Sequence, residues 1–111
     1  MTSIGAPAIL NGDEAGLWGG VRSQKLMPWA DQSDAMNTYM LEYNRRLIAI
    51  GNSTLGLQSA DCRVVFPDKA AGMFAFSRTW QNRPTIVVIN NGDRARTVRL
   101  PITGRFRDLL N

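Results

Sequence analysis

The sequence contains no histidine and a single cysteine, Cys62, in 111 residues. Without histidine, the chain cannot supply Ser-His or Cys-His nucleophilic catalysis, and a zinc site would lose its commonest nitrogen ligand. A lone cysteine cannot form an intrachain disulfide, so we expect Cys62 to be a small core or half-exposed side chain. The sequence predicts neither a metal site nor a bound cofactor.

Long apolar runs are also missing. No stretch approaches the roughly 20 apolar residues of a transmembrane helix, and residues 1–10 lack the basic start and apolar run of a signal peptide. With 44% hydrophobic and 20% charged residues, the composition is that of an ordinary globular protein. We therefore expect a soluble chain without a membrane partner. A cytoplasmic location is slightly favoured, although the sequence does not encode the localisation.

Positive charge is in excess, with 13 Lys and Arg against 9 Asp and Glu. Most of the cations are scattered, and the only cluster lies near the C-terminus, at Arg94, Arg96, Arg99, Arg105 and Arg107. Such a cluster can follow phosphates, but it is more often the solvated face of a sheet. Nucleic acid is therefore not the expected partner.

The N-terminal segment Gly5–Glu14, with the sequence GAPAILNGDE, predicts a buried strand from Ala8 to Leu10 and then a turn. The turn carries two adjacent carboxylates, Asp13 and Glu14. Strand ends of this kind surround the active sites of α/β barrels. Consecutive side chains diverge, so these two carboxylates are expected to bond to the loop backbone or to form a salt bridge.

A helix is predicted from about Asp34 to Ile50. Apolar residues recur there at spacings of three and four, which is typical of one packed helix face. Asp31 or Ser33 would cap its start and Gly51-Asn52 would end it. The stripe, which we expect to pack in the core, consists of Met36, Tyr39, Met40, Tyr43, Leu47 and Ile50.

After residue 60 the pattern becomes that of short strands separated by turn residues. It predicts a small antiparallel β-sandwich or meander in an α+β chain, with a boundary that separates residues 1–52 from residues 53–111. The expected strands are Arg63–Phe66, Met73–Thr79, Thr85–Asn90, Thr97–Leu100 and Arg105–Leu109.

The order of these segments resembles the C-terminal end of the α-amylase family, glycoside hydrolase family 13. GAPAILNGDE is similar to the segment of that family's eighth barrel strand, and residues 16–20 and 27–29 are similar to the loop behind it. YNRRLIA at 43–49 is similar to the closing helix, and FAFSR at 74–78, IVVINN at 86–91 and VRLP at 98–101 are similar to the C-terminal β-domain. The resemblance implies a remnant of a (β/α)8 barrel over 1–52 and a C-terminal β-domain over 53–111.

The resemblance also implies a parent enzyme that hydrolyses α-glucosidic bonds with retention. The family's three catalytic carboxylates belong to earlier barrel strands that match nothing here, so the chain alone is predicted not to be catalytic. Asp13 and Glu14 would be structural residues of the barrel rim. Trp18, Trp29 and Trp80 could stack on the sugar rings of an α-glucan or malto-oligosaccharide, and Trp80 is expected to be exposed at a hairpin tip.

Away from a barrel, the edges of the first strand and the helix stripe would be uncovered. We therefore expect self-association into a homo-oligomer through residues 1–50. The alternative is a free-standing module, derived from such a tail, that oligomerises or binds carbohydrate. The sequence does not determine the glucan linkage, the number of subunits, or whether Met1 is a natural start.

Overall fold

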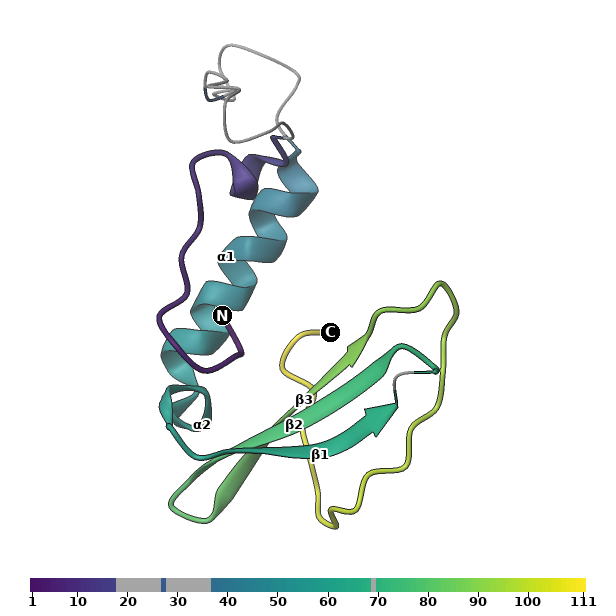
Figure 1. The fold of residues 1–111 in the computed structure, drawn as a ribbon. Coiled ribbons are helices and arrows are strands. Elements are labelled where there is room, and N and C mark those ends of the chain that lie inside the picture. The colour runs from purple at the N-terminus through teal and green to yellow at the C-terminus, as the bar shows by residue number, and fades with distance from the viewer. Residues whose placement is uncertain (18–26, 28–36, 69) are drawn as a thin grey trace.

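The computed structural model describes residues 1–17, 27, 37–68 and 70–111. A short 3₁₀ helix, η1 (Asp13–Ala15), precedes the long helix α1 (Thr38–Ser53) and the single-turn helix α2 (Leu55–Gln58). Three strands follow, β1 (Cys62–Asp68), β2 (Met73–Trp80) and β3 (Arg83–Asn90). Figure 1 shows α1 and the N-terminal segment side by side at one end of the sheet, an arrangement that agrees with the α+β expectation.

The sheet is an antiparallel meander in the order β1-β2-β3. β2 and β3 stay in register from Met73↔Asn90 to Trp80↔Arg83. The turn between them consists of Gln81 and Asn82, with φ angles of 46° and 61°, as a two-residue turn that matches the twist of the strands requires. The three strands predicted between residues 63 and 90 are thereby confirmed.

The core is small and centres on β2. Alternate residues of this strand face opposite sides of the sheet, and both Ala75 and Phe76 are buried. α2 covers the face that carries Phe76, where it buries Leu57. Gly56 lies so close to Thr85 that a Cβ atom would overlap the threonine side chain, so glycine is needed for this contact. No helix was predicted from the sequence where α2 lies.

The predicted buried strand at Ala8–Leu10 is wrong. The segment has no regular structure, and the Leu10 side chain is 72% exposed. No described strand lies beside it to pair with its backbone, so it bonds locally instead. The Leu10 N–H donates to Asp13 Oδ2 at 3.2 Å, and the Asp13 N–H donates to the Leu10 carbonyl at 3.0 Å.

The prediction of a helix is confirmed, but both of its ends are wrong, because α1 begins at Thr38 and continues beyond Ile50. α1 runs through Gly51 to Ser53, because the Gln58 side chain donates to the carbonyls of Gly51 and Asn52 and satisfies the last turn. At the other end, the Asn37 side chain accepts from the Met40 N–H at 3.0 Å. The caps proposed from the sequence, at residues 31 and 33, lie outside the described residues.

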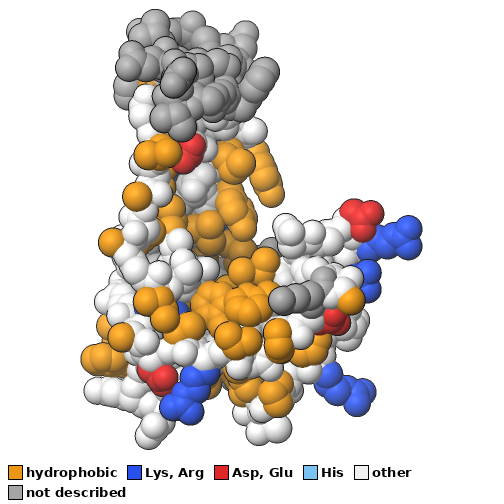
Figure 2. All heavy atoms as spheres, viewed as in Figure 1, with side chains coloured by type: hydrophobic (Ala, Val, Ile, Leu, Met, Phe, Trp, Pro, Cys, Tyr) orange, Lys and Arg blue, Asp and Glu red, His pale blue; other side chains and the backbone are white. Residues whose placement is uncertain are grey.

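The described part of the predicted stripe is not core, because no residue of α1 is buried; Leu47 and Ile50 are half-buried, and Met36 lies outside the described residues. The N-terminal segment runs along a different face of α1, which includes Leu41 and Ile48. Hydrophobic side chains therefore stay at the surface along α1 and around its junction with the sheet (Figure 2). None of the described helices has the length and apolar composition needed to cross a membrane.

The strands expected at Thr97–Leu100 and Arg105–Leu109 do not form, so the meander is confirmed and the sandwich is not. Asn90 ends the sheet: its Oδ1 accepts from the Gly92 N–H and its Nδ2 donates to the Arg94 carbonyl. These bonds turn the chain away from β2. The remaining residues return past the sheet without regular structure, and the C-terminus ends near α1 (Figure 1).

Candidate functional site

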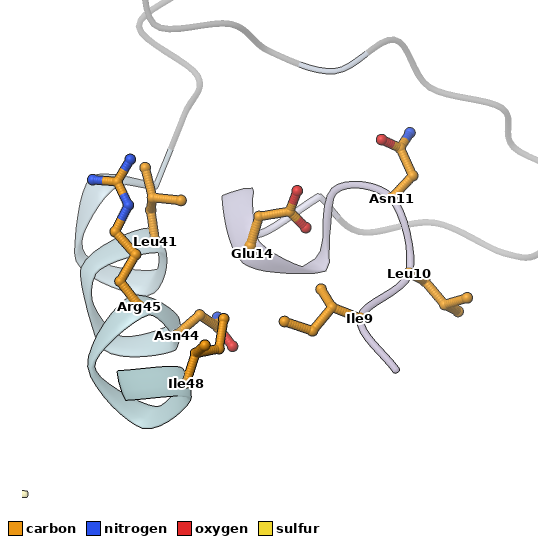
Figure 3. A pocket seen from close by; sticks show the side chains of 8 residues that line it. All are labelled: Ile9, Leu10, Asn11, Glu14, Leu41, Asn44, Arg45 and Ile48. Atoms are coloured by element: carbon orange, nitrogen blue, oxygen red, sulfur yellow. The ribbon is translucent and has the colours of Figure 1, made fainter. Parts of the chain in front are cut away.

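Two hollows flank α1. The first, which we call the N-terminal cavity, has a volume of about 300 Å³ and lies between residues 9–14 and α1 (Figure 3). Ile9, Leu41 and Ile48 give it apolar walls, and Glu14 is its carboxylate. The cavity is thus a largely apolar pocket with one acidic group.

The two carboxylates predicted for the barrel rim behave differently. Asp13 accepts the backbone N–H of Leu10 and so holds its own turn. Glu14 belongs to η1 and lines the N-terminal cavity, with its Oε2 atom buried and without a hydrogen-bond partner. In the part of the chain that the structure describes, neither residue forms an ion pair. A role at a barrel rim stays a prediction for both.

The second hollow, which we call the C-terminal groove, has a volume of about 580 Å³ and separates α1 from the end of the chain. The Tyr39 and Tyr43 rings stack on its helix side, with centroids 6.4 Å apart and planes 16° from parallel. Glu42, Arg45 and Arg46 also line it, together with Leu110 and Asn111. The sequence had placed both tyrosines in the core. Their spacing of four residues was the signal for the stacked pair.

Asp108 fixes the chain end beside this groove. Its carboxylate accepts from the Leu110 N–H at 2.9 Å, from the Asn111 N–H at 3.2 Å and from the Asn111 side-chain amide at 3.1 Å. These bonds, the side-chain amide of Asn111 first, lower the pKa of Asp108 below its ordinary value, and the charge of Arg46 acts in the same direction. The last four residues therefore form a closed turn that faces α1.

Comparison with known proteins shows which enzymes the chain is similar to. Neopullulanase 2 of Thermoactinomyces vulgaris is 31% identical over 102 residues, which is 92% of this chain and 17% of that protein. Cyclomaltodextrinase of Geobacillus thermopakistaniensis (strain MAS1) is 27% identical over 113 residues, which is 100% of this chain and 19% of that protein. The chain resembles part of an α-amylase family glycoside hydrolase.

The chain spans less than a fifth of the length of either relative. No family model matches it, and no solved structure matches it. The resemblance drawn from the sequence motifs is confirmed at the family level, and both relatives are α-glucan-active enzymes of that family. The barrel origin of residues 1–52 is a further step that these matches do not address.

An α-amylase family site needs two carboxylates across a sugar ring. The N-terminal cavity offers Glu14 alone, and the C-terminal groove offers Glu42 alone. Over the described ranges, no three acidic, cysteine or histidine side chains gather as they would around a metal ion. Each hollow can accept hydrogen bonds from a ligand, but neither holds a pair of acids.

Of the three tryptophans proposed for sugar contact, only Trp80 is among the described residues. It is the last residue of β2, beside the hairpin turn, and its side chain is 43% exposed. It lines neither hollow. Trp18 and Trp29 lie outside the described residues.

Arg78 is a residue whose position the sequence did not reveal. It is 5% exposed and points toward the junction of the N-terminal segment with α2. Its Nε and Nη2 atoms donate to the Ser59 carbonyl, and its Nη1 donates to the carbonyls of Thr2 and Ser3, each at 3.1 Å. Arg78 thus joins the two parts of the chain that the sequence had separated.

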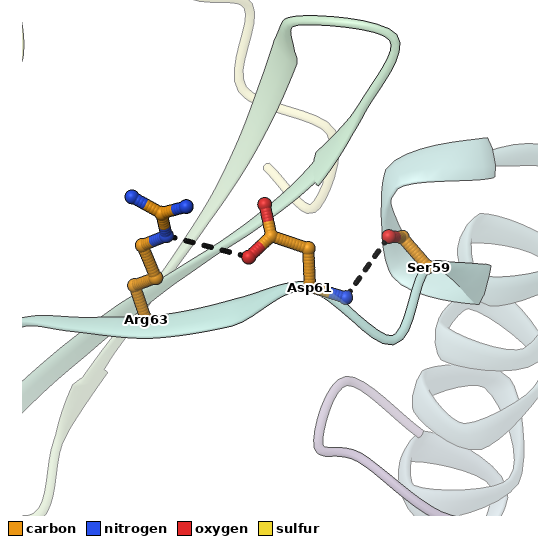
Figure 4. A network of polar contacts seen from close by, with 3 residues as sticks. All are labelled: Ser59, Asp61 and Arg63. Carbon is orange, nitrogen blue, oxygen red and sulfur yellow. Dashed lines mark hydrogen bonds and ion pairs between the residues drawn. The ribbon is translucent and has the colours of Figure 1, made fainter.

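The junction at Ser59 is extended by a surface network (Figure 4). The Asp61 N–H donates to Ser59 Oγ at 3.1 Å, and Arg63 Nε donates to Asp61 Oδ1 at 3.3 Å. The Asp61–Arg63 pair is solvent-exposed, so it contributes little to stability. The buried contact of Arg78 with the Ser59 carbonyl is the stronger tie.

Proposed function

We propose that this chain is the C-terminal part of an α-glucan-active glycoside hydrolase and that its own role is structural. The observation that supports this proposal is the single carboxylate in each hollow. Retaining hydrolysis needs two carboxyl groups about 5 Å apart, one as nucleophile and one as acid and base. The parent would carry out that reaction with residues that this chain does not contain.

A hydrolysis assay on the chain alone tests the proposal. Cyclomaltodextrin, pullulan and maltotriose would be incubated with the purified chain and with its Glu14→Gln and Glu42→Gln variants. We expect no release of reducing sugar above the buffer blank for any of the three proteins. Turnover by the wild-type chain that one of these variants abolishes would refute the structural role.

The same proposal divides the chain at residues 52 and 53 into a barrel remnant and a β-domain. The bonds from Arg78 to Thr2 and Ser3 imply that the two parts are held together. We therefore expect limited proteolysis to cut elsewhere before it cuts residues 51–60. Early cleavage there, with release of a stable 53–111 piece, would instead indicate two independent units.

We further propose that residues 1–50 mediate self-association. The described residues of this part of the chain include several exposed apolar side chains, with Leu10 and Tyr39 each more than 70% exposed. Such exposure is typical of an interaction surface. Light scattering at protein concentrations from about 5 µM to about 1 mM, where a small interface is expected to associate, should show a mass that rises with concentration. A constant monomer mass would refute the self-association.

The second candidate is a carbohydrate-binding module, and the exposure of Trp80 favours it. An indole ring can stack on the C–H face of a pyranose. Titration calorimetry with maltoheptaose should detect binding by the wild-type chain and by Trp80→Phe, which keeps an aromatic face, and should detect none by Trp80→Ala if Trp80 is the platform. The absence of a binding signal in all three proteins removes this candidate.

A further inference from the structure

The turn end of the β2–β3 hairpin, residues 80–83, extends beyond the strand pairing of β1. β1 pairs with β2 only as far as Arg78, whereas β3 stays paired with β2 up to Trp80. Figure 1 shows this end of the hairpin beside the start of β1. We call these four residues the hairpin tip. Two strands and a turn therefore support its side chains.

Trp80 and Arg83 lie side by side in the hairpin tip. They are partners directly across the two strands, so their side chains are on the same face of the sheet, with Cβ atoms about 4.5–5.5 Å apart. The Trp80 side chain is 43% exposed, and Arg83 is exposed as well. Within the described residues, no other aromatic ring packs against Trp80. An indole ring and a guanidinium are thus presented together.

The guanidinium of Arg83 has no acidic partner among the described residues. The sequence contains no Asp or Glu between residues 69 and 92. Asp61 is tied to this region through its backbone carbonyl, which accepts from the Thr79 N–H, but its carboxylate accepts from Arg63. The N–H donors of Arg83 are therefore available to a ligand.

We propose that Trp80 and Arg83 together bind one glucosyl unit of an α-glucan, and that Arg83 recognises its hydroxyl groups. The inference rests on the second candidate of the proposed function, the carbohydrate-binding module, and adds the polar half of its site. The Trp80 ring would receive the C–H face of the pyranose. The planar fork of Arg83 can donate to two neighbouring oxygens, and a 4-linked glucosyl unit keeps its 2- and 3-hydroxyl groups free for this contact.

The charges around the tip favour a neutral sugar over an anion. Arg83 is the single cation of the hairpin tip. Arg78, on the same face of β2, already donates to the carbonyls of Thr2, Ser3 and Ser59. One exposed cation in water holds an anionic group weakly. A neutral sugar uses both the ring and the hydrogen-bond donors.

Binding is expected to be weak, because the tip lines neither hollow and would contact a sugar on one side only. A dissociation constant on the order of 1 mM corresponds to such a contact. Two-dimensional ¹⁵N NMR of the labelled full chain measures binding in this range during a titration with maltoheptaose. The backbone amides of residues 80–83 and the Trp80 indole N–H should shift together. The separate indole signals of Trp18 and Trp29 report on any other site.

Substitutions separate the two halves of the site. Trp80→Ala should abolish the shifts of the tip amides, whereas Trp80→Phe should retain them. Arg83→Met should weaken binding about five- to tenfold, since it removes the hydrogen bonds to the sugar. Arg83→Lys should recover only part of the affinity, because an ammonium group has no fork. Arg63→Met removes the same charge from exposed β1 and should bind as the wild-type chain does. Unchanged signals away from the tip show that each variant is folded.

Three results would overturn the inference. If the tip signals of the wild-type chain do not shift, this inference and the carbohydrate-binding candidate both fail, while the structural role stands. If Trp80→Ala abolishes binding but Arg83→Met binds with unchanged affinity, the candidate stands and the role of Arg83 is wrong. If glucose 1-phosphate shifts the tip in place of maltoheptaose, and about 1 M NaCl removes that shift by screening, the tip is an anion site.

Discussion

Replacement of Arg78 by methionine is expected to destabilise the chain more than any other single change of a charged residue. The guanidinium is almost fully buried and donates to three backbone carbonyls, those of Thr2, Ser3 and Ser59. Methionine fills a similar length of space without donating, so the carbonyls lose their partner. The N-terminal segment then loses its tie to the sheet.

The magnitude follows from how each carbonyl would be solvated afterwards. Hydrogen bonds to a charged donor contribute about 1.5–3 kcal/mol each, and the Ser59 carbonyl, which receives two donors, loses most. Thr2 and Ser3 are partly or fully exposed, so water replaces much of their loss. Arg78→Met also removes the cost of burying a cation, and this offsets part of the lost hydrogen-bond energy. The net loss in unfolding free energy is about 2–4 kcal/mol.

Urea unfolding followed by far-UV circular dichroism measures this loss. Arg78→Lys should lose about half as much, since one ammonium group cannot span Ser59 and the N-terminal carbonyls together. Arg63→Met, which removes an exposed arginine, should stay within about 0.5 kcal/mol of the wild-type chain. If Arg78→Met also stays within that margin, the buried guanidinium does not hold the fold together and the reasoning fails.

Three other perturbations test separate parts of the fold. Asn82→Ala should cost about 1 kcal/mol in urea unfolding because φ is 61° there, whereas Asn82→Gly should be neutral or stabilising. Gly56→Ala should cost about 1–3 kcal/mol because a methyl group overlaps Thr85, and a normal melting temperature would show that α2 is not docked on β3. The pKa of Asp108 is lowered in the folded chain, so its contribution is present above the ordinary value of 3.8 and is lost as pH falls through the lower folded value. The Asn111 amide resonance should shift in that acidic range and should not titrate in Asp108→Asn.

The strands between residues 62 and 90 could be predicted because each is specified locally. Met73–Trp80 alternates between the two faces of a sheet, and Asn82 tolerates the left-handed backbone of a tight hairpin. The segment 97–100 alternates in the same way but does not pair. Alternation indicates which face of a sheet a residue would occupy, but it does not indicate whether a neighbouring strand is close enough to pair with the segment.

The candidate site was harder to predict. That Asp13 would bond to its own loop followed from the short range of the contact, and the structure has that bond. The C-terminal groove could not be foreseen, because it joins Tyr39 and Tyr43 to Leu110 and Asn111 across most of the chain. These contacts depend on the path by which the irregular C-terminal segment returns to α1, and local sequence patterns do not determine that path.

The order of residue types alone determined the helix, the meander and the likeness to a glycoside hydrolase, since periodicity and motifs are properties of neighbouring residues. Whether a given face would be covered was decided by the tertiary structure. Tyr39, Met40 and Tyr43 of the α1 stripe stay exposed because the N-terminal segment packs on another side of the helix. Arg78 became a buried tie for the same reason: only folding brings the carbonyls of Thr2, Ser3 and Ser59 within reach of one side chain.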